Sequence, residues 1–551
     1  MLNKLIISAL LIGCYACNKS DDGGPAAVTP PAKFALTGVA VNEVTGTKSF
    51  YNVPVNASIR LSFSAPVNSA SLNTALSLQT QQGDAVPFSY NLSAGDSVLI
   101  LQPESLGKLL QYQLQVKTTL RSKAGTAPDS VNTIKIITAI DSADKFPRIS
   151  DEALLDLVQR QTFRYFRDFA HPVSGMARDR NQNPDLVTTG GTGMGAMAIV
   201  TAVHRGFISR QEGLAQIVKI VDFLRNKATT YHGAYTHFIN GASGATIPFS
   251  TKDNGADLVE TSLLMQGLLT ARQFFSGGDA TEAALRLHIT DMYNKVEWNW
   301  FRKDNGNVLY WHWSPDHNWD VNLPVAGWNE ALITYVLAAA PGAYTIPKSV
   351  YDEGWARSGA IRHNKSYYNI NLPLGEELGG PLFFSHYSFL GLDPRKLKDA
   401  YADYNEQVTA HSRINYQYSV SNPRNYNGYS SSLWGLTASD NNYSGYSAHS
   451  PNNDAGVISP TAAVSSIPFT PEQSMEALRF FYYTLGDRLF GEYGFKDAFN
   501  LTDLWFAPSY LAIDQGPQII MIENYRSGLL WNLFMSCPEV QAALTKLGFS
   551  Y

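Results

Sequence analysis

The sequence predicts an antiparallel β-sandwich followed by an all-α, double-layered (α/α)6 barrel, and three observations support this fold class. All ten tryptophans and all eleven histidines lie after residue 150. Residues 34–140 contain short runs that alternate between apolar and polar side chains. From Asp151 onward, apolar residues instead recur every three or four positions, as in helices. We therefore place one domain at 34–140 and a second, larger one at 150–551.

The first domain shows the period of two that is typical of half-buried strands. Alternating runs occur at Ile59–Phe63, Ser97–Leu101, Tyr112–Val116 and Ile134–Ile136, between turn-like clusters such as SAGD and KAGTAPDS. This pattern predicts a sandwich of about 100 residues. The segments NVPVNASIRLSFSAPVN and YQLQVKTTLRSKAG resemble bacterial Ig-like domains. That resemblance implies a spacer or a sugar-binding module, and the absence of tryptophan favours the spacer.

The second domain consists mainly of long helices. Helical periodicity occurs at 151–170, 193–206, 210–228, 256–275, 281–298, 329–340, 471–488 and 516–535. The segments GMGAMAIVTAV and NEALITYVLAAA are apolar nearly all round, which is expected of helices buried on several sides. About 400 residues shared among twelve helices give about 33 per helix with its connection, which suits an (α/α)6 barrel. A solenoid would need a regular repeat, and none is visible.

Residues 1–17 resemble a lipoprotein signal peptide. Lys4 precedes an apolar run that is too short to span a bilayer, and the run ends in a lipobox-like sequence at Cys14. Cys17 is a second candidate for lipidation, and the acidic residues after it are common in exported surface lipoproteins. We expect 18–33 to be a flexible tether and the protein to be an outer-membrane lipoprotein facing the periplasm or the cell surface. The alternative is an ordinary cleaved signal with incidental cysteines.

Composition and charge exclude several classes of protein. Hydrophobic residues make up 44%, aromatic residues 12% and charged residues 16% of the chain, which fits a packed globular protein. The net charge of -5 and the lack of a Lys/Arg run argue against a nucleic-acid partner. Only Cys537 lies outside the leader, so the mature chain is neither a disulfide scaffold nor a thiolate metal site. We expect a monomer that contacts the membrane only through its lipid.

Three carboxylates open a largely apolar helical segment. Asp253, Asp257 and Glu260 are four and three residues apart, so they share one face if the helix already begins near Asp253. Acidic groups gathered at the start of a buried helix shift one another's pKa values, as an acid–base pair requires. The alternative is that Asp253 or Asp257 caps the helix and Glu260 lies near its positive end.

A second carboxylate region follows a segment rich in tryptophan. Glu330 enters an almost wholly apolar helix, beside Trp328 and Asn329, where a carboxylate either caps the helix or lines a cavity. Six of the ten tryptophans fall within thirty-one residues, and some of them must be core residues: Trp298, Trp300, Trp311, Trp313, Trp319 and Trp328. Indole faces pack on the C–H faces of sugar rings, so this segment is typical of a saccharide cleft.

Two further loops enter buried helices. Asp514 and Gln515 precede Gly516 and Pro517, where a proline fits the first helical turn. Asp514 is then a cap, a sugar ligand or a water-activating base. Arg178 and Asp179 precede the glycine-rich stretch 188–193, which lacks the Gly-Lys-Ser/Thr ending of a phosphate loop and favours close backbone packing instead.

No metal or serine-hydrolase motif is evident. Asp316 and Asp320 fall in a segment that only faintly resembles a calcium loop, because it lacks the required glycine and glutamate. Neither an HExxH nor a GxSxG pattern occurs. We therefore expect no metal and no cofactor.

Seven segments of the second domain together resemble the glycoamylase-like domain, and within it glycoside hydrolase family 144. They are QTFRYFRDFAHPVSGMARDR, TGGTGMGAMAIVTAVHRGFISRQE, PFSTKDNGADLVETSLLMQGLL, WNEALITYVLA, GGPLFFSHYSFLGLDPR, GYSAHSPNNDAGVISPTAAVSSIPFTPEQSMEALRFFY and AIDQGPQIIMIENYRSGLLWNLF. The resemblance implies an (α/α)6 barrel, no metal and hydrolysis of β-1,2-glucan with inversion. It also implies that Asp253, Asp257, Glu260 and Glu330 are cleft carboxylates.

The resulting hypothesis is a lipid-anchored glycoside hydrolase that acts on β-1,2-glucan or sophoro-oligosaccharides. We assign Glu330 as the acid and Asp514 as the base, with Asp257 and Glu260 as a sugar-binding and charge-tuning pair. Substrate contacts are expected from Asp253, Arg178, Asp179, Trp311, Trp313, Trp328, Asn329, His386 and Gln515. One alternative is a phosphorylase or transglycosylase, which would hold phosphate with residues such as Arg178 and Arg180. Another is a non-catalytic glycan-binding lipoprotein.

Overall fold

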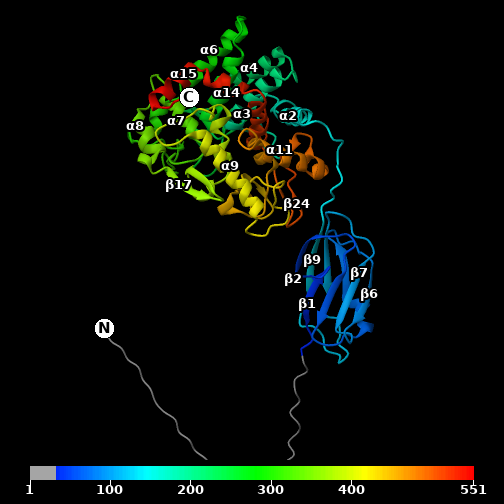
Figure 1. Cartoon of the computed structure of the whole chain (residues 1–551). Coiled ribbons are helices and arrows are strands. Elements are labelled where there is room, and N and C mark those ends of the chain that lie inside the picture. The colour runs from blue at the N-terminus through cyan, green and yellow to red at the C-terminus, as the bar shows by residue number, and fades with distance from the viewer. Residues whose placement is uncertain (1–32, 47) are drawn as a thin grey trace, which may run out of the picture. The chain divides into compact units, whose positions relative to one another are not determined.

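The structure, a computed structural model, describes residues 33–46 and 48–551. The expected signal peptide, both candidate lipidation cysteines and nearly all of the expected tether lie outside the described residues. The chain divides into two compact units, a strand-rich unit and a helical unit that includes Ile136–Tyr551. In Figure 1 the strands of the first unit are blue and the helices of the second run from cyan to red.

The strand-rich unit contains two sheets. The strands are β1 (Leu36–Val41), β2 (Val44–Gly46), β3 (Ser49–Val53), β4 (Ile59–Phe63), β5 (Leu76–Thr80), β6 (Phe88–Ser93), β7 (Val98–Pro103), β8 (Gln111–Val116) and β9 (Asn132–Thr138), with a short α1 (Leu72–Ala75) before β5. The sheet orders are β2-β1-β4-β7-β6 and β3-β9-β8-β5. Ile59 pairs with Leu101, and Leu61 with Leu99, and all four side chains are fully buried. The alternation in the sequence therefore matches the buried and outer faces of the sheets.

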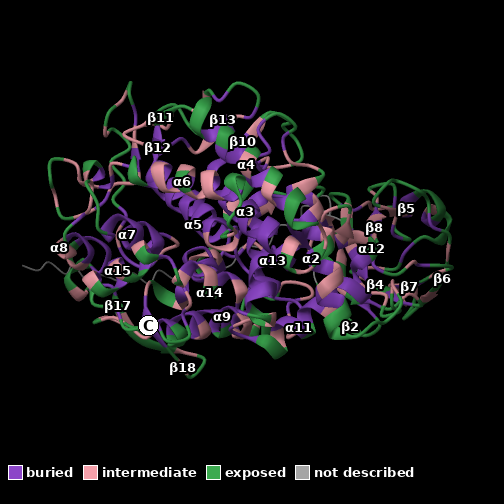
Figure 2. Ribbon diagram, turned by 90° about the horizontal axis from the view of Figure 1, so that it is seen from above, coloured by how far each residue is buried: buried purple, intermediate pink, exposed green. Residues whose placement is uncertain are grey.

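The first helix of the helical unit, α2, begins at Asp151. Its helices are α2 (Asp151–Arg167), α3 (Thr189–His204), α4 (Arg210–Asn226), α5 (Leu258–Phe274), α6 (Ala280–Asn294), α7 (Leu332–Ala339), α8 (Lys348–Val350), α9 (Tyr404–Ser421), α10 (Pro460–Ser465), α11 (Pro471–Arg479), α12 (Gly486–Leu489), α13 (Ala512–Arg526), α14 (Leu529–Met535) and α15 (Pro538–Leu547). Burial concentrates on α3, α5 and α13, as Figure 2 shows in purple. These are the helices whose first turns carry candidate site residues.

Short strands connect the helices. They are β10 (Leu186–Thr188), β11 (Thr230–Tyr231), β12 (Ala234–Tyr235), β13 (Phe238–Asn240), β14 (Thr246–Ile247), β15 (Ala256–Asp257), β16 (His312–Trp313), β17 (Arg362–Tyr367), β18 (Ile370–Leu374), β19 (Ala438–Asn441), β20 (Gly445–Ala448), β21 (Phe490–Gly491), β22 (Gly494–Phe495), β23 (Phe499–Asn500) and β24 (Trp505–Phe506). Among the described residues, no helix has both the length and the apolar character needed to span a bilayer.

Helix starts follow the expected capping chemistry. Ser209 and Glu212 form a reciprocal capping box at the start of α4. Asp279 and Asp403 each accept two backbone N–H groups at the starts of α6 and α9. These caps satisfy backbone donors that have no partner within the helix, so they fix where each helix begins.

Glycines allow α3 and α5 to pack backbone against backbone. A Cβ atom on Gly193 would lie 2.2 Å from the carbonyl oxygen of Leu263, and one on Gly267 would lie 1.9 Å from the carbonyl oxygen of Gly193. Real side chains do not tolerate such distances. The interpretation of 188–193 as a close-packing segment is thus confirmed, and the N-terminus of α3 lies beside the first turn of α5.

Two predictions about α13 are wrong. The helix begins at Ala512, so Pro517 lies inside it rather than in its first turn. A proline at 517 has no N–H for the carbonyl of Ile513, and the hydroxyl of Tyr387 donates to that oxygen instead, at 3.1 Å. The predicted helix 516–535 is also two helices, because Gly528 adopts the left-handed conformation between α13 and α14.

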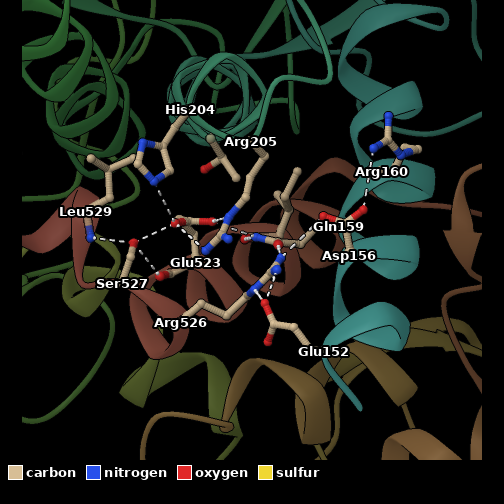
Figure 3. Close-up of polar contacts among 12 residues, drawn as sticks. Glu152, Asp156, Gln159, Arg160, His204, Arg205, Glu523, Arg526, Ser527 and Leu529 are labelled. Carbon is tan, nitrogen blue, oxygen red and sulfur yellow. Dashed lines mark hydrogen bonds and ion pairs between the residues drawn. The ribbon is translucent and has the colours of Figure 1, made fainter. Parts of the chain in front are cut away.

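A buried ion-pair network joins α2, α3 and α13 (Figure 3). The side chain of Glu523 is completely buried and accepts two hydrogen bonds from Arg205, at 2.6 and 2.9 Å. Gln159 of α2 donates to the same carboxylate at 3.2 Å. Removal of one partner would leave an uncompensated buried charge, so this network stabilises the packing of the three helices.

Candidate active site

Asp257 ends β15 and caps α5. Its Oδ1 accepts a hydrogen bond from the amide of Glu260 at 2.9 Å, and its Oδ2 lies 2.9 Å from Nδ1 of His237. Asp253 lies in a turn before the helix, so the condition for a shared helical face is not met, and the alternative, capping by Asp257, is confirmed. Asp253 instead lies 2.9 Å from Nε2 of His312. The Asp257 carboxylate therefore caps α5 with one oxygen and holds the His237 ring in place with the other.

Glu260 lies against the N-terminus of a second helix. Its Oε2 accepts hydrogen bonds from the amide of Gly190 at 2.6 Å and from the hydroxyl of Thr188 at 3.3 Å. A Cβ on Gly190 would come within 2.8 Å of the same oxygen, so glycine is required there. Burial raises the pKa of Glu260, and Asp257 adds to this, whereas His237 and the Gly190 amide act in the opposite direction.

His237 connects these carboxylates electrostatically. Burial lowers its pKa, but the charge of Glu260 and the hydrogen bond to Asp257 more than offset burial and bring the pKa to about 9. The imidazole is therefore protonated at neutral pH and partly neutralises the two carboxylates. A cation, two carboxylates and a helix N-terminus thus meet at the start of α5.

Glu330 directly precedes the first turn of α7. The carbonyl oxygen of Glu330 accepts a hydrogen bond from Ser388, whose hydroxyl oxygen also accepts from the amide of Ile333 at 3.0 Å. Burial raises the pKa of the Glu330 carboxyl to about 7, with further increases from Glu260 and Asp257. The predicted upward shift is confirmed, and its main cause is burial.

A second carboxylate group surrounds Asp514, in the first turn of α13. Asp514 is 5% exposed and Asp497 is fully buried, and one carboxyl oxygen of each, Asp514 Oδ2 and Asp497 Oδ1, has no hydrogen-bond partner on the protein. Burial raises the pKa of Asp514 well above its ordinary value, and the charge of Asp497 raises it further. Two buried carboxyls in contact cannot both ionise easily, so the pair holds one proton near neutral pH.

Arg180 connects two more aspartates to this group. Its Nε lies 3.0 Å from Asp179 Oδ2, and one terminal nitrogen lies 3.0 Å from Asp440 Oδ1. The amide of Asp440 donates to Asp497 Oδ2 at 2.7 Å. Asp179 was predicted to contact the substrate. In the structure it pairs with Arg180, which also pairs with Asp440, and the amide of Asp440 donates to Asp497.

Tyr387 lies between the two carboxylate groups. Its hydroxyl is held by the carbonyl of Ile513, one residue before Asp514. Burial raises the pKa of Tyr387 well above its ordinary value. Electrostatic interactions with Asp514, Tyr446, Glu330 and Glu260 raise it further. The phenol therefore lies within electrostatic reach of both groups.

The tryptophan-rich segment reaches the site through a short sheet. β16 pairs with β15, so that Trp313 lies opposite Ala256, and the amide of Leu258 donates to the carbonyl of Trp311 at 2.8 Å. Trp311 and Trp313 are both partly exposed beside Asp257. Trp328 is different, because it is 6% exposed and packs on Phe389 and Tyr404. Trp328 is a core residue, and its prediction as a sugar-stacking residue is wrong.

Two further predicted substrate ligands have structural roles instead. Gln515 is fully buried and donates to the carbonyl of Phe495 at 2.7 Å. Arg178 donates to the carbonyls of Pro184 and Phe169 and lies over the Phe169 ring, with its guanidinium carbon 4.6 Å from the centroid. These contacts hold loops together, so neither side chain is available to a sugar.

His386 and Asn329 lie close to the site without facing a ligand-sized space. His386 is 2% exposed, and it lines with Tyr387 and Asp514 a cavity of about 10 Å³, which has room for one water but not for a sugar ring. Burial, with a contribution from His411, lowers the pKa of His386 to about 3, so this histidine is neutral. Asn329 Oδ1 accepts from the amide of Ala331 at 2.9 Å and shapes the turn before α7.

Comparisons with known proteins agree with this architecture. The model of the bacterial Ig-like domain family matches residues 36–135, and that of the family described as "Putative glucoamylase" matches residues 322–538. The solved structure of an endo-β-1,2-glucanase from Chitinophaga pinensis, with sophorotriose and glucose, is 52% identical with a TM-score of 0.71. The match covers 73% of this chain and 99% of that one.

The chain belongs to the glycoamylase-like glycoside hydrolases of family 144. A β-1,2-glucanase from Parabacteroides distasonis is 38% identical, and the match covers 93% of this chain and 73% of that one with a TM-score of 0.71. A curated exo-β-1,2-glucooligosaccharide sophorohydrolase from the same species is 46% identical over 429 residues, or 74% of this chain. The matched part makes up only 59% of the length of that relative.

Several residues of this candidate site were missed from the sequence. His237, Tyr387, Asp440 and Asp497 lie in loops or two- to four-residue strands, where no periodicity marks a functional side chain. One usable signal was the isolated aspartate between two phenylalanines, GFKDAF. Asp440 lies on the hairpin β19–β20.

Proposed function

We propose that the protein hydrolyses β-1,2-glucan or sophoro-oligosaccharides with inversion of the anomeric configuration. The observation that carries this proposal is the presence of two separate carboxylate groups at the N-termini of buried helices, one with a protonatable Glu330 and one centred on Asp514. The names of the relatives, an endo-glucanase and a sophorohydrolase, support the substrate class. Inverting glycosidases use such a separated pair of carboxyls.

Glu330 serves as the general acid. A carboxyl with a pKa of about 7 is largely protonated below neutral pH and can donate its proton as the glycosidic bond breaks. The negative charges of Glu260 and Asp257 keep that proton in place before the reaction. Protonated His237 limits the repulsion among these groups, so the site tolerates three acidic side chains in a small buried volume.

Asp514 serves as the general base toward water. Asp514 and Asp497 titrate as a pair, and Asp514 accepts a proton from water in the form of the pair in which the single shared proton lies on Asp497. Arg180, through Asp440, fixes the position of Asp497. Asp253, Asp179, Trp311 and Trp313 remain the proposed sugar contacts.

The helical unit is proposed to be an (α/α)6 barrel. Support comes from the packing in succession of the helices α10, α13, α3, α5 and α7. Further support comes from the helices that pack outside this layer, namely α11, α2, α4, α6, α14 and α15. Helix N-termini of the inner layer then converge where the carboxylates lie.

The phosphorylase alternative is disfavoured because both arginines proposed to hold phosphate are already engaged by other groups. Arg178 is occupied by backbone carbonyls, and Arg180 is held between Asp179 and Asp440. A phosphate would also meet four aspartates around Arg180, which disfavours an anion. Incubation of the protein with linear β-1,2-glucan, with and without phosphate, tests the proposal by the products on a thin-layer plate. Free sophoro-oligosaccharides in both lanes are expected, whereas a glycosyl phosphate or an absence of products would contradict hydrolysis.

Cleavage is expected to be independent of metal ions. Within the described ranges, no three His, Cys, Asp or Glu side chains gather as ligands for a metal ion. Asp316 accepts from Asn254 at 2.6 Å and Asp320 pairs with Lys252 at 3.1 Å. Activity measured after treatment with EDTA and gel filtration should equal that of the untreated enzyme. Activity that is lost and then restored by calcium would contradict this and point to Asp316 and Asp320.

We also propose that the protein is a monomeric outer-membrane lipoprotein, acylated at Cys14 or Cys17. The support is the lipobox-like sequence of the leader. Cells fed a labelled fatty acid should label the full chain, and the Cys14→Ala/Cys17→Ala double variant should stay unlabelled. Equal labelling of both proteins would disprove the anchor.

A further inference from the structure

A second pocket lies on the tryptophan-rich segment, outside the carboxylate site. It has a volume of about 330 Å³ and is lined by Glu297, Asn299, Trp300, Asp304, Asn305 and Trp319. Two indoles, two carboxylates and two amides are the groups that a pyranose needs: flat apolar faces for its C–H groups and polar groups for its hydroxyls. None of these residues takes part in the proposed chemistry.

Trp300 forms a rigid platform in this pocket. It is 41% exposed, although tryptophans are usually largely buried, and it is the most exposed of the ten in this chain. One face of its indole stacks on His232, with ring centroids 3.9 Å apart and planes inclined by 15°. His232 Nδ1 is in turn 2.9 Å from Glu297. An exposed indole that is fixed in this way loses little conformational entropy when a ligand packs on it.

The polar side of the pocket is a strained turn. Lys303, Asp304 and Asn305 have consecutive φ values of 41°, 57° and 59°, in the left-handed region that non-glycine residues seldom adopt. Arg302 holds the turn by donating to the carbonyls of Gly306 and Asn305, both at 2.8 Å. The strain directs the exposed Asp304 and Asn305 side chains to the pocket that Trp300 and Trp319 also line.

The pocket is continuous with the carboxylate site through aromatic rings. Trp313 contacts His232 edge to face at 5.1 Å and Trp300 at 6.4 Å. The same Trp313 pairs with Ala256, the residue before Asp257. A polymer lying across Asp257 and Trp313 would therefore reach Trp300 next.

We propose that this pocket binds a glucose unit of the β-linked glucan chain several residues away from the bond that is cleaved. The proposal rests on the proposed function for the identity of the chain, and it adds a remote holding site that acts only on long substrates. Binding at this site would lower KM for polymer and leave the chemical step unchanged, because no pocket residue contacts the proposed acid or base.

Trp300→Ala, compared with the wild type, tests the pocket. The variant should raise KM for β-1,2-glucan polymer about tenfold, the usual consequence of losing a central indole contact. Its kcat on polymer, and its kcat/KM on the shortest oligosaccharide that is cleaved, should stay within about twofold of the wild type. Trp300→Phe, which keeps an aromatic face, should restore most of the affinity. Tyr525→Ala is the matched control, since Tyr525 is 44% exposed near the end of α13.

The outcomes separate this inference from the proposed function. An unchanged KM for polymer in Trp300→Ala would overturn the pocket, and so would an equal loss on short and long substrates. If the wild type cleaves no β-1,2-glucan, the function fails, but the pocket is still measured by the retardation of the Glu330→Gln variant in a gel containing β-1,2-glucan. Retardation that Trp300→Ala does not weaken in that background would then overturn the pocket.

Discussion

Glu330→Gln is expected to lower kcat about a thousandfold or more, with substrate binding largely kept. Glutamine has nearly the same size and fills the same position before α7, but it cannot donate a proton to the leaving oxygen. Burial keeps the native carboxyl protonated up to about pH 7, so the substitution removes a proton donor that is already in place before the reaction. Single-turnover kinetics with a β-1,2-glucan oligosaccharide would separate the chemical step from binding.

The pH profile of the wild type provides a second measurement of the same assignment. Because the acid must be protonated, kcat/KM should fall as pH rises through about 7, the pKa of Glu330. Glu472→Gln is the matched control, since Glu472 is exposed in the first turn of α11 and should give normal kinetics. Near-normal turnover in Glu330→Gln would refute the acid assignment and transfer it to Glu260.

Asp514→Asn is expected to cause a loss of similar size, because an amide cannot accept a proton from the attacking water. Azide, an anion that needs no base, should restore part of the activity of this variant. The reaction with azide should yield a glycosyl azide, which mass spectrometry detects. Wild-type enzyme should form none at the same azide concentration, because water is activated there.

Asp497→Asn distinguishes the two members of the pair. It removes the neighbour that shares the proton, so the pKa of Asp514 should fall and the acidic limb of the kcat/KM profile should move to lower pH. Near-normal turnover in Asp514→Asn together with inactive Asp497→Asn would assign the base to Asp497. If neither variant loses activity, the second carboxylate group has no part in the reaction.

The sequence reveals those parts of the site that lie where apolar helices begin. Glu260, Glu330 and Asp514 each stand out because a carboxylate interrupts a helix that is otherwise apolar. His237 and Asp497 could not be found in this way, since they reach the site through short strands and through packing between distant segments. A local pattern indicates a helix, but it does not show which loop from another part of the chain will cover its end.

Aromatic residues show the same limit. The tryptophan-rich segment correctly marks a wall beside Asp257, yet Trp328 is in the core and Trp300 is exposed. Their sequence neighbours do not distinguish them. The difference arises because Trp328 packs on Phe389 and Tyr404 in the core, whereas Trp300 stacks one face on His232 and stays 41% exposed.

The glycine contact between α3 and α5 sets the position of the Glu260 carboxylate relative to the start of α3. Gly193 and Gly267 set how closely the two helix axes approach, and that spacing allows the Glu260 carboxylate to reach the Gly190 amide. A methyl group at either position would separate the helices, and the Glu260 carboxylate would lose this hydrogen bond while its own sequence surroundings stayed intact. The environment of the Glu260 carboxylate is thus set partly by residues that have no side chain.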